Sequence, residues 1–351
     1  MKVLFLNFEK GWRGGERQTL YALQGFKDAG SSAEVVCRKG SALEKEAIEG
    51  GFKAHSFSSI FGVIFFLITK GSRFDFMLPQ TSQILTYCVL TKFFHRSKIF
   101  FARRVNFSQR GFFTKLKYQL TDKIIAVSNP VKETLTRFTK RNDIEVIPDV
   151  VVEKQINHNR AKEVLAKLKI GNHKIVATTA ALTSEKDPFT LVDAIKKLSE
   201  KRNDFVFIHF GSGNLLESVS EKIKENNLQD LYVLMGFVND VEDFFAVFNV
   251  FVFNSREEGL GSSVLDAFIY KVPVVSTDAG GLKDLVSEDR GIQCPIGDSS
   301  ALAEGISELL SNEKKAKLYI ANAFNYVNQF HSSNHVTNQY IKLMNQMTKV
   351  S

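Results

Sequence analysis

Two acidic residues separated by seven positions bracket a glycine-rich turn in the second half of the sequence. They are Glu258 and Asp266, in NSREEGLGSSVLDAFIYKVPVVSTDAGG, residues 254–281. One apolar run precedes the turn and another follows the second acid, so the turn is predicted to join a buried strand to a helix. Glu258 then lies in the loop, with its neighbour Glu257 as the alternative functional acid.

This pattern predicts a site for phosphate and sugar hydroxyl groups. The turn formed by Gly259, Leu260, Gly261 and Ser262 can bring backbone N–H groups against a phosphate or a hydroxyl. Asp266, about a turn and a half into the helix, can accept two hydrogen bonds from a vicinal diol such as a ribose. The alternative for Asp266 is an acid on a solvated helix face.

Another charged residue stands at the start of a predicted helix. Lys186 directly precedes Asp187-Pro188 in ATTAALTSEKDPFTLVDAI. A cation is unfavourable at a helix N-terminus, because the helix dipole is positive there. The placement is explained if an anion also binds at this point and needs a counter-charge. An exposed lysine without a role is the alternative.

Glycines also follow two other predicted strands. Gly14 and Gly15, in FEKGWRGGERQTL, precede a helix, where an anion can approach backbone N–H groups; ordinary turn glycines are the alternative. Gly236 and Phe237 follow the strand in LYVLMGFVNDV, a position suited to reading the edge of a nucleobase. The first loop lacks the Gly-x-Gly-x-x-Gly spacing, so a nicotinamide-dependent dehydrogenase is not favoured.

The elements that must position these residues alternate between short apolar runs and longer amphipathic stretches. Alternation of strands and helices predicts parallel sheets with right-handed crossovers. Strands are predicted at 3–7, 33–36, 76–78, 99–102, 124–127, 145–147, 175–179, 205–210, 232–235, 250–254 and 272–276, and helices at 17–29, 130–136, 188–201, 215–226, 241–245, 262–270 and 300–310.

The length of 351 residues predicts two domains. The alternation is interrupted near residues 150–172, and the two halves have similar patterns. We therefore expect an α/β protein with two facing Rossmann-like domains, at 1–160 and 161–335, and a C-terminal helix at 336–351 that packs back on the first. Ligands of such sheets bind beyond the carboxyl ends of the strands, so a central cleft is expected.

The net charge of +8 is unevenly distributed. Residues 1–150 hold 24 Lys and Arg against 13 Asp and Glu, whereas the remainder holds 22 against 25. The segment 92–123 carries nine basic residues, one acid and seven interleaved phenylalanines. This composition is typical of an anionic membrane surface contact or of nucleic-acid binding; a solvated face over buried phenylalanines is the alternative. No nucleic-acid motif accompanies it. The residues expected on the acceptor or membrane side are Arg103, Arg104, Arg110, Lys115 and Lys117.

Other sequence features bear on compartment and cofactors. No signal peptide is predicted at the MKVLFLNF start, and the most apolar window, Ile60–Thr69, is too short to span a bilayer. Cys37, Cys88 and Cys294 match no metal or redox spacing, which indicates a reducing, cytosolic setting. We predict no metal site and no cofactor.

The sequence resembles the retaining GT-B glycosyltransferases of the family 4 type. The motif Glu258-x7-Asp266 with the following PVVSTDAGG and LKDLV carries the resemblance. Further matching segments, in the same order along nearly the whole chain, are GGERQTL, KIIAVSNPVKETL at Lys123–Leu135, VIPDV at Val146–Val150 and SEKDPFTLVDAIKKL at Ser184–Leu198.

The resemblance implies a nucleoside-diphosphate sugar as donor, a saccharide or glycolipid acceptor, and metal-independent transfer with retention. Relatives often build lipopolysaccharide, capsule or glycolipids, which implies a cytoplasmic enzyme peripheral to the inner face of the membrane. Lys186 and Glu258 would be catalytic, Lys186 on the diphosphate and Glu258 on the donor sugar. Residues implied to bind the donor are Gly14, Gly15, Gly236, Phe237, Gly259, Leu260, Gly261, Ser262 and Asp266.

Three departures from the family pattern stand out. Asp266 replaces the usual glutamate, and Ala181 occupies the position of an arginine that helps to neutralise the diphosphate. Arg256, Arg103 and Arg104 are the candidate substitutes. The usual histidine of the first domain is not evident in IFFARRVN, residues 99–106. The alternative functions are a GT-B-like sugar-nucleotide epimerase or phosphorylase, and a catalytically weak module that binds anionic surfaces.

Overall fold

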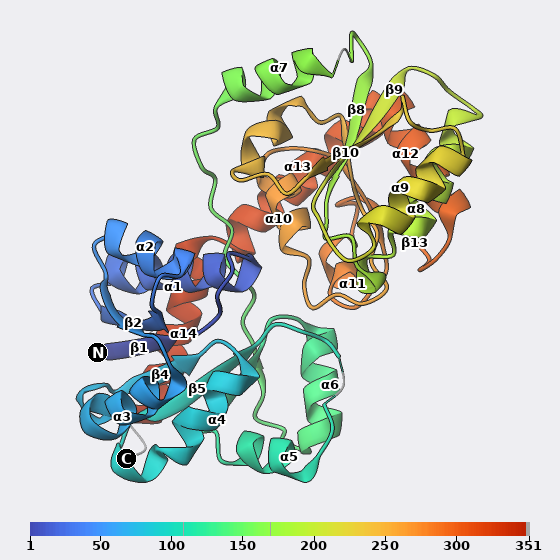
Figure 1. Cartoon of the computed structure of the whole chain (residues 1–351). Coiled ribbons are helices and arrows are strands. Elements are labelled where there is room, and N and C mark those ends of the chain that lie inside the picture. Colours follow the sequence, from blue (N-terminus) through green and yellow to red (C-terminus); the bar gives the residue numbers. More distant parts are fainter. Residues whose placement is uncertain (108, 169, 349–351) are drawn as a thin grey trace. The chain divides into compact units, whose positions relative to one another are not determined.

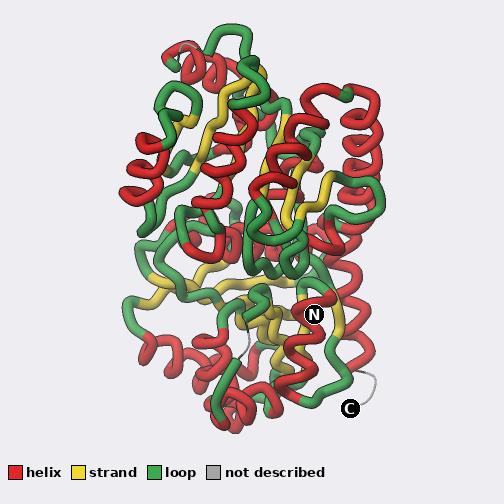
Figure 2. The backbone as a smooth tube through the Cα atoms, turned by 90° about the vertical axis from the view of Figure 1, so that its right-hand side faces the viewer, coloured by secondary structure: helices red, strands yellow, loops and turns green. Residues whose placement is uncertain are grey.

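The computed structural model describes residues 1–107, 109–168 and 170–348, and it divides into two compact units (Figure 1). Unit 1 comprises residues 1–152 with those from 330 onward, and unit 2 comprises residues 153–329. The sequence-based boundaries at 160/161 and 335/336 lie a few residues away from these. Residues 349–351 of the predicted C-terminal helix lie outside the described residues. In each unit the strands are enclosed by helices (Figure 2).

Unit 1 contains a parallel seven-stranded sheet in the order β3-β2-β1-β4-β5-β6-β7. Its central strands are nearly continuous apolar runs, as expected for strands that are buried on both faces. The strands are β1 Lys2–Leu6, β2 Ser32–Arg38, β3 Lys53–Phe57, β4 Phe76–Pro79, β5 Lys98–Arg103, β6 Lys123–Ala126 and β7 Glu145–Val146.

Two groups of helices cover this sheet. The first group consists of α1, α2 and α14. These helices share one hydrophobic core with alternate strand residues such as Phe5 and Phe100. Phe101 points the opposite way and contacts Tyr118 of α5, so the row of α3, α4, α5 and α6 covers the other face. The helices of unit 1 are α1 Gly14–Asp28, α2 Ala42–Glu49, α3 Ile60–Lys70, η1 Gly71–Arg73, α4 Ser82–Leu90, η2 Lys92–Phe94, α5 Phe112–Gln119, α6 Asn129–Thr139 and α14 Ser333–Thr348.

Unit 2 contains a parallel six-stranded sheet in the order β10-β9-β8-β11-β12-β13. The strands are β8 Lys174–Thr179, β9 Phe205–Phe210, β10 Tyr232–Gly236, β11 Val250–Phe253, β12 Val274–Thr277 and β13 Ile292–Cys294. The helices are α7 His158–Lys167, η3 Ser184–Lys186, α8 Pro188–Ser199, α9 Leu216–Glu225, η4 Val241–Val247, α10 Ser262–Ile269, α11 Leu282–Leu285, α12 Ser299–Ser311 and α13 Glu313–Phe330.

The structure corrects the predicted elements at several places. Strands β3 and β13 were not predicted, because edge strands with mixed sequences such as KAHSF lack a continuous apolar run. The predicted helix at 241–245 is a 3₁₀ segment, η4. The apolar window at 60–69 forms the helix α3. Among the described helices, none is both long and apolar enough to cross a membrane.

Candidate functional site

The candidate site of unit 2 lies at the carboxyl ends of two adjacent parallel strands, β8 and β11. After β8 the chain leads through η3 into α8, and after β11 it passes through residues 254–261 into α10. Because adjacent parallel strands end at the same edge of a sheet, these two loops meet there. Lys186 comes from the first loop and Glu258 from the second.

Lys186 and Glu258 form an ion pair between the Nζ and Oε2 atoms. Both side chains are largely buried, with 20% and 17% of their surfaces exposed. The Lys186 ammonium also lies 4.7 Å from the ring centroid of Phe253, and Glu258 Oε1 accepts a 3.1 Å hydrogen bond from the Gly259 N–H group. The two residues assigned as catalytic from the sequence are therefore direct neighbours.

A second ion pair joins the same two loops. Arg256 Nη2 lies 3.0 Å from Asp187 Oδ2, and the Arg256 N–H group donates to the Glu185 carbonyl at 2.8 Å. The Asp187 carboxylate also accepts a 2.7 Å hydrogen bond from Thr190, and the Asp187 carbonyl accepts one of 2.7 Å from Asn254. The Arg256 side chain is 55% exposed, so it supplies an accessible cation next to the residue that follows Lys186.

The position that lacks the family's arginine is exposed. Ala181 lies on the surface between β8 and η3. Of the three candidate substitutes, Arg256 lies in the same unit and is tied to the residues on both sides of Lys186. Arg103 and Arg104 belong to unit 1, where their guanidinium groups are used locally.

The glycine turn between Glu258 and α10 is shaped by close backbone packing. Gly261 has φ of 102°, in the left-handed region, and a Cβ atom there would lie 2.4 Å from Leu282 Cδ2. A Cβ atom on Gly281 would lie 2.2 Å from the Gly259 carbonyl oxygen, and the Gly281 N–H group donates to the Glu258 carbonyl at 3.1 Å. The Gly-Gly pair of the motif therefore allows α11 to pack directly on the turn.

The turn leads directly into the N-terminus of α10. The N-cap residue of this helix is Gly261, which has no side chain, and no side-chain cap is formed within the described part of the chain. Ser263 donates from Oγ to the Thr179 carbonyl at 3.2 Å, which ties the first turn of α10 to the end of β8. The first N–H groups of a helix lack intrahelical partners and carry partial positive charge, so this end of α10 can interact with an anion.

Further predicted donor residues of unit 2 lie at the end of a strand or in the loops and the helix that follow the strands of its sheet. Asp266 is buried, with 7% of its surface exposed, so its interpretation as a solvated helix acid is wrong. Gly236 ends the edge strand β10 with φ of 68°, a Cβ atom there would meet no atom of the described residues within 4 Å, and Phe237 after it is largely exposed. Leu260 is buried within the turn. Contact of Asp266 with a ribose, or of Gly236 and Phe237 with a base, stays a prediction.

Two buried polar atoms at the end of β11 have no hydrogen-bond partner among the described residues. They are Asn254 Oδ1 and Ser255 Oγ, although the backbone of Ser255 is held by Thr277 through bonds of 3.0 and 2.7 Å. A buried polar atom without a partner is unfavourable, and in native proteins such atoms are usually satisfied by water or a ligand. Sequence reasoning missed both residues, because only their burial distinguishes them.

The glycine pair of unit 1 begins α1, but an acidic side chain already occupies this helix end. Glu16 accepts a 2.9 Å hydrogen bond from the Arg13 N–H group and a 3.0 Å bond from Asn7 Nδ2. Gly14 is exposed, and a Cβ atom on Gly15 would meet no atom of the described residues within 4 Å, so the surface at this glycine pair is open. Approach of a diphosphate to Gly15 stays a prediction.

Three of the five predicted acceptor-side cations are engaged inside unit 1. Arg104 binds Asp149 at 2.8 Å and Gln80 at 2.6 Å, and Arg103 donates to the carbonyls of two residues in the following loop. Lys117 donates to Ser82 and Thr86 of α4, and burial together with nearby Arg103 lowers its pKa. Arg110 is exposed and Lys115 is half-buried.

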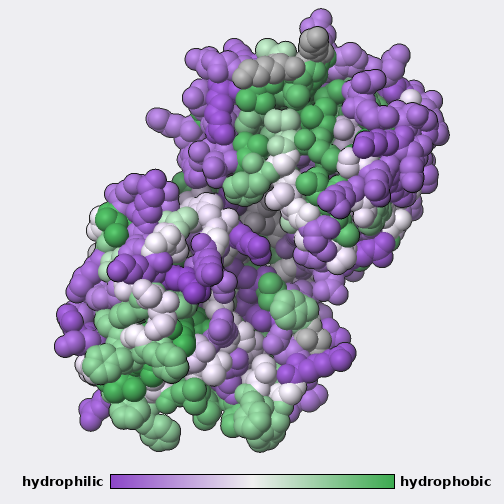
Figure 3. Space-filling view, in the orientation of Figure 1, coloured by the Kyte–Doolittle hydropathy of each residue, from purple (hydrophilic) through white to green (hydrophobic). Residues whose placement is uncertain are grey.

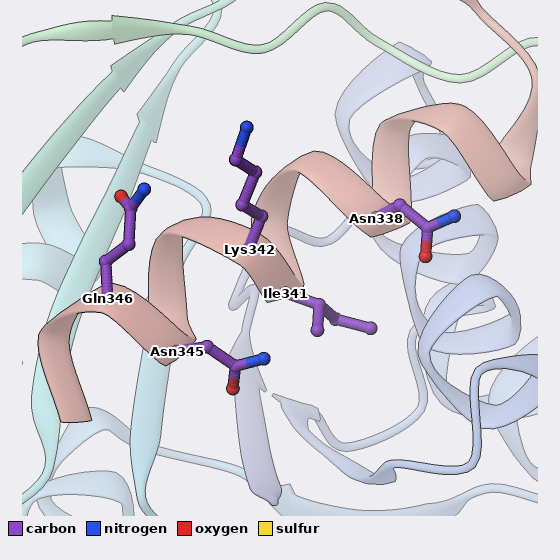
Figure 4. Close-up of a pocket in the computed structure, with 5 residues that line it drawn as sticks. All are labelled: Asn338, Ile341, Lys342, Asn345 and Gln346. Atoms are coloured by element: carbon purple, nitrogen blue, oxygen red, sulfur yellow. The ribbon is translucent and has the colours of Figure 1, made fainter. Parts of the chain in front are cut away.

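Unit 1 also contains a shallow depression of about 370 Å³ on α14. Its lining side chains all project from this one helix (Figure 4): Asn338, Ile341, Lys342, Asn345 and Gln346. None of the predicted site residues lines it. In the described part of the chain, no group of three or more His, Cys, Asp or Glu side chains is arranged to hold a metal ion.

The segment that contains the candidate site matches a known protein family. Residues 160–326 match the family model of the glycosyl transferases group 1. Unit 2 is a glycosyl transferases group 1 domain. The match includes both loops of the candidate site and the motif from Glu258 to Asp266.

Relatives of this glycosyltransferase domain come from several bacteria. The chain is 29% identical over 203 residues to the 2-deoxystreptamine N-acetyl-D-glucosaminyltransferase of Niallia circulans, covering 56% of this chain and 51% of the relative. It is 28% identical over 200 residues to the capsular polysaccharide biosynthesis glycosyltransferase CapM of Staphylococcus aureus, covering 54% and 52%. The chain thus spans about half the length of these curated relatives.

The fold of both units is found in solved structures. Anabaena HepE, crystallised with UDP and glucose, superposes with a TM-score of 0.85 over 99% of this chain and 100% of that protein, at 17% identity. The predicted α/β GT-B fold class is thereby confirmed.

Proposed function

We propose that the protein is a retaining, metal-independent glycosyltransferase that uses a nucleoside-diphosphate sugar. The observation that carries the proposal is the Lys186–Glu258 ion pair at the carboxyl ends of β8 and β11, inside the glycosyl transferases group 1 domain. A cation and an acid at this edge of the sheet supply the two groups that the reaction needs, one for the leaving diphosphate and one for the donor sugar.

In the proposed reaction, the bond between the anomeric carbon and the diphosphate oxygen breaks, and its electron pair stays on the diphosphate. The acceptor oxygen bonds to the anomeric carbon on the same face, and its proton passes to the leaving diphosphate oxygen. Lys186 and Arg256 stabilise the growing negative charge, together with the N–H groups at the start of α10. Arg256 thereby substitutes for the arginine that Ala181 replaces.

Glu258 is proposed to hold the hydroxyl groups of the donor sugar, because its carboxylate is fixed by Lys186 and by the Gly259 N–H group. Asp266 and the end of β10 are proposed to bind the nucleoside. The partnerless atoms Asn254 Oδ1 and Ser255 Oγ support a bound polar ligand or ordered water beside this loop.

The donor and the acceptor are proposed by class. HepE was crystallised with UDP and glucose, so a UDP-sugar is the first donor to test. The relationship to CapM supports a precursor of capsule, lipopolysaccharide or another glycolipid as acceptor. We place the enzyme in the cytoplasm, at the inner face of the membrane, where such precursors are assembled.

A thermal-shift screen with UDP, GDP, ADP and CMP tests the donor site first. A ligand present at ~100 times its dissociation constant stabilises the folded state by about 2.7 kcal/mol. We expect a shift with one nucleoside diphosphate, followed by slow hydrolysis of the matching sugar nucleotide in the absence of acceptor. Epimerised donor, or a sugar 1-phosphate formed with added phosphate, would instead identify an epimerase or a phosphorylase. A shift without turnover would leave a binding module.

A further inference from the structure

The outer surface of one helix row in unit 1 is unusually rich in exposed aromatic side chains. Six phenylalanines from three segments are 59–100% exposed: Phe61 and Phe65 of α3, Phe93 and Phe94 of η2, and Phe112 and Phe113 of α5. Leu90, Leu116 and Leu120 of the same row are also exposed. In Figure 3, hydrophobic side chains gather over the part of unit 1 where Figure 1 shows α3, α4 and α5.

The spacing shows that whole helix faces are apolar on the solvent side. In α3, Phe61 and Phe65 are four residues apart and exposed, while Val63 and Leu67 on the other side are buried. Phe112 and Leu116 of α5 and the C-cap residue Leu120 form a stripe at intervals of four residues. The solvent-facing stripe of a surface helix normally consists of polar residues. In these helices the solvent-facing stripe is apolar instead.

The exposed residues belong to neighbouring segments. Helix α3 contacts η2 and α4, η2 contacts α4, and α4 contacts α5. With about 150–250 Å² per phenylalanine side chain, the six rings expose on the order of 900 Å². The largest apolar patch on a typical monomer is roughly 300–600 Å², and larger ones mark interaction sites.

The charge of the same row is almost entirely positive. Residues 58–121 contain ten Lys and Arg but a single acid, Asp75. Four of the cations are engaged internally: Lys92 with Asp122, and Arg103, Arg104 and Lys117 as described above. Lys70, Arg73, Arg96 and Arg110 are exposed, Lys98 and Lys115 are half-buried, and none of these six forms an ion pair within the described part of the chain.

We propose that these exposed aromatic residues, leucines and cations form an apolar–basic face that docks on an anionic membrane surface. The rings would enter the boundary between headgroups and acyl chains, and the cations would lie at the level of the lipid phosphates. A membrane fits better than a nucleic acid, because the rings lie on the outsides of helices rather than along a groove that tracks a phosphate backbone. It also explains why the row has ten cations against a single acid. The proposal rests on the location given under the proposed function and deepens it by naming the surface that makes the contact. Vesicle binding and donor hydrolysis are measured separately, so either can fail alone.

Vesicle sedimentation of the full-length protein tests the proposal. Vesicles of phosphatidylcholine alone are compared with vesicles that also contain phosphatidylglycerol, at low and high salt. Binding should rise with phosphatidylglycerol and fall with salt, since surface charges are screened beyond ~8 Å at physiological ionic strength. Phe61→Ser with Phe65→Ser, and separately Phe112→Ser with Phe113→Ser, should each weaken binding on the order of tenfold or more. Arg73→Glu with Arg96→Glu should do the same at low salt.

Matched controls come from the opposite face of unit 1. Ile48→Ser removes an exposed apolar side chain of α2, and Lys39→Glu with Lys45→Glu makes the same charge change as the arginine pair. These controls should bind vesicles like the wild type, and all variants should keep the wild-type melting temperature and donor hydrolysis. Equal binding to neutral vesicles, or equal losses in the controls, would overturn the proposal. So would self-association in ultracentrifugation that the Phe61→Ser, Phe65→Ser variant abolishes, because the face would then bind a second copy.

Discussion

The ammonium group of Lys186 and the carboxylate of Glu258 are paired although 72 residues separate them in the chain. The pair joins the loop after β8 to the loop after β11, and the Lys186 ammonium lies over the ring of Phe253. Both side chains are largely buried, and the positive charge of Lys186 compensates the negative charge of Glu258. Replacing either residue therefore changes the charge that a bound ligand meets, and it leaves the other residue with a partly buried charge that has lost its partner.

Lys186→Ala should lower turnover on the order of 100-fold or more, because the leaving diphosphate loses its main cation. The measurement is release of nucleoside diphosphate from the donor identified in the screen. Lys222→Ala is the matched control, since Lys222 forms a 2.7 Å ion pair with Asp193 elsewhere in unit 2. Turnover that is unchanged by Lys186→Ala would remove Lys186 from the site.

Glu258→Gln should lower turnover while the protein stays folded, because the substitution keeps the shape of the side chain and removes its charge. Glu257→Gln should have little effect, since Glu257 is exposed while Glu258 is held by Lys186. Kinetics of the two variants side by side check this assignment. The reverse outcome, a silent Glu258→Gln and an inactive Glu257→Gln, would move the functional acid by one residue.

Arg256→Ala should reduce turnover about tenfold, less than Lys186→Ala, because the guanidinium is more exposed and its charge is better screened. Arg256→Lys keeps the charge and should recover part of the loss. The separate effects on kcat and KM are measured with the same donor. Equal activity of wild type and Arg256→Ala would mean that Arg256 does not substitute for the arginine that Ala181 replaces.

Gly261→Ala should destabilise the protein by about 1–3 kcal/mol, because its φ of 102° strains any L side chain and the new methyl group would collide with Leu282. Gly15→Ala is the contrasting variant: nothing lies within 4 Å of its Cβ position, and alanine favours the helix. Urea unfolding of both variants measures the difference. Similar free energies of unfolding would show that the turn before α10 relaxes without cost.

His209 makes the stability of the protein depend on pH. It is buried between the Tyr232 hydroxyl and the Ala180 carbonyl, and burial lowers its pKa from 6.5 to about 4. Between these values the unfolded chain binds the proton and the folded one does not, so stability falls as the pH drops from about 6.5 to about 4, by roughly 3 kcal/mol at most.

The variant His209→Gln isolates this effect, because glutamine can still donate to the Ala180 carbonyl but does not titrate in this range. The free energy of unfolding of both proteins is measured by urea denaturation across this pH range. The wild type should lose more stability than the variant on acidification. Parallel curves would contradict the assignment to His209.

The sequence by itself determined the alternation of strands and helices and the short motifs that follow the strands. Apolar runs identified the central strands of both sheets, because such strands are buried on both faces and tolerate few polar residues. The motif from Glu258 to Asp266 identified the loop and helix of the candidate site, because its glycines and acids are close in sequence. Edge strands such as β3 gave no comparable signal.

Only the tertiary structure decided which charges are available and which aromatic residues are exposed. Arg256 and Arg104 look alike in the sequence, but packing leaves the first half-exposed beside Asp187 and binds the second to Asp149 and Gln80. Phe100 is buried in a strand, whereas Phe93 is fully exposed only a few residues earlier. The physical reason is that burial and pairing arise when distant segments pack together, and composition within a segment does not encode which segments those are.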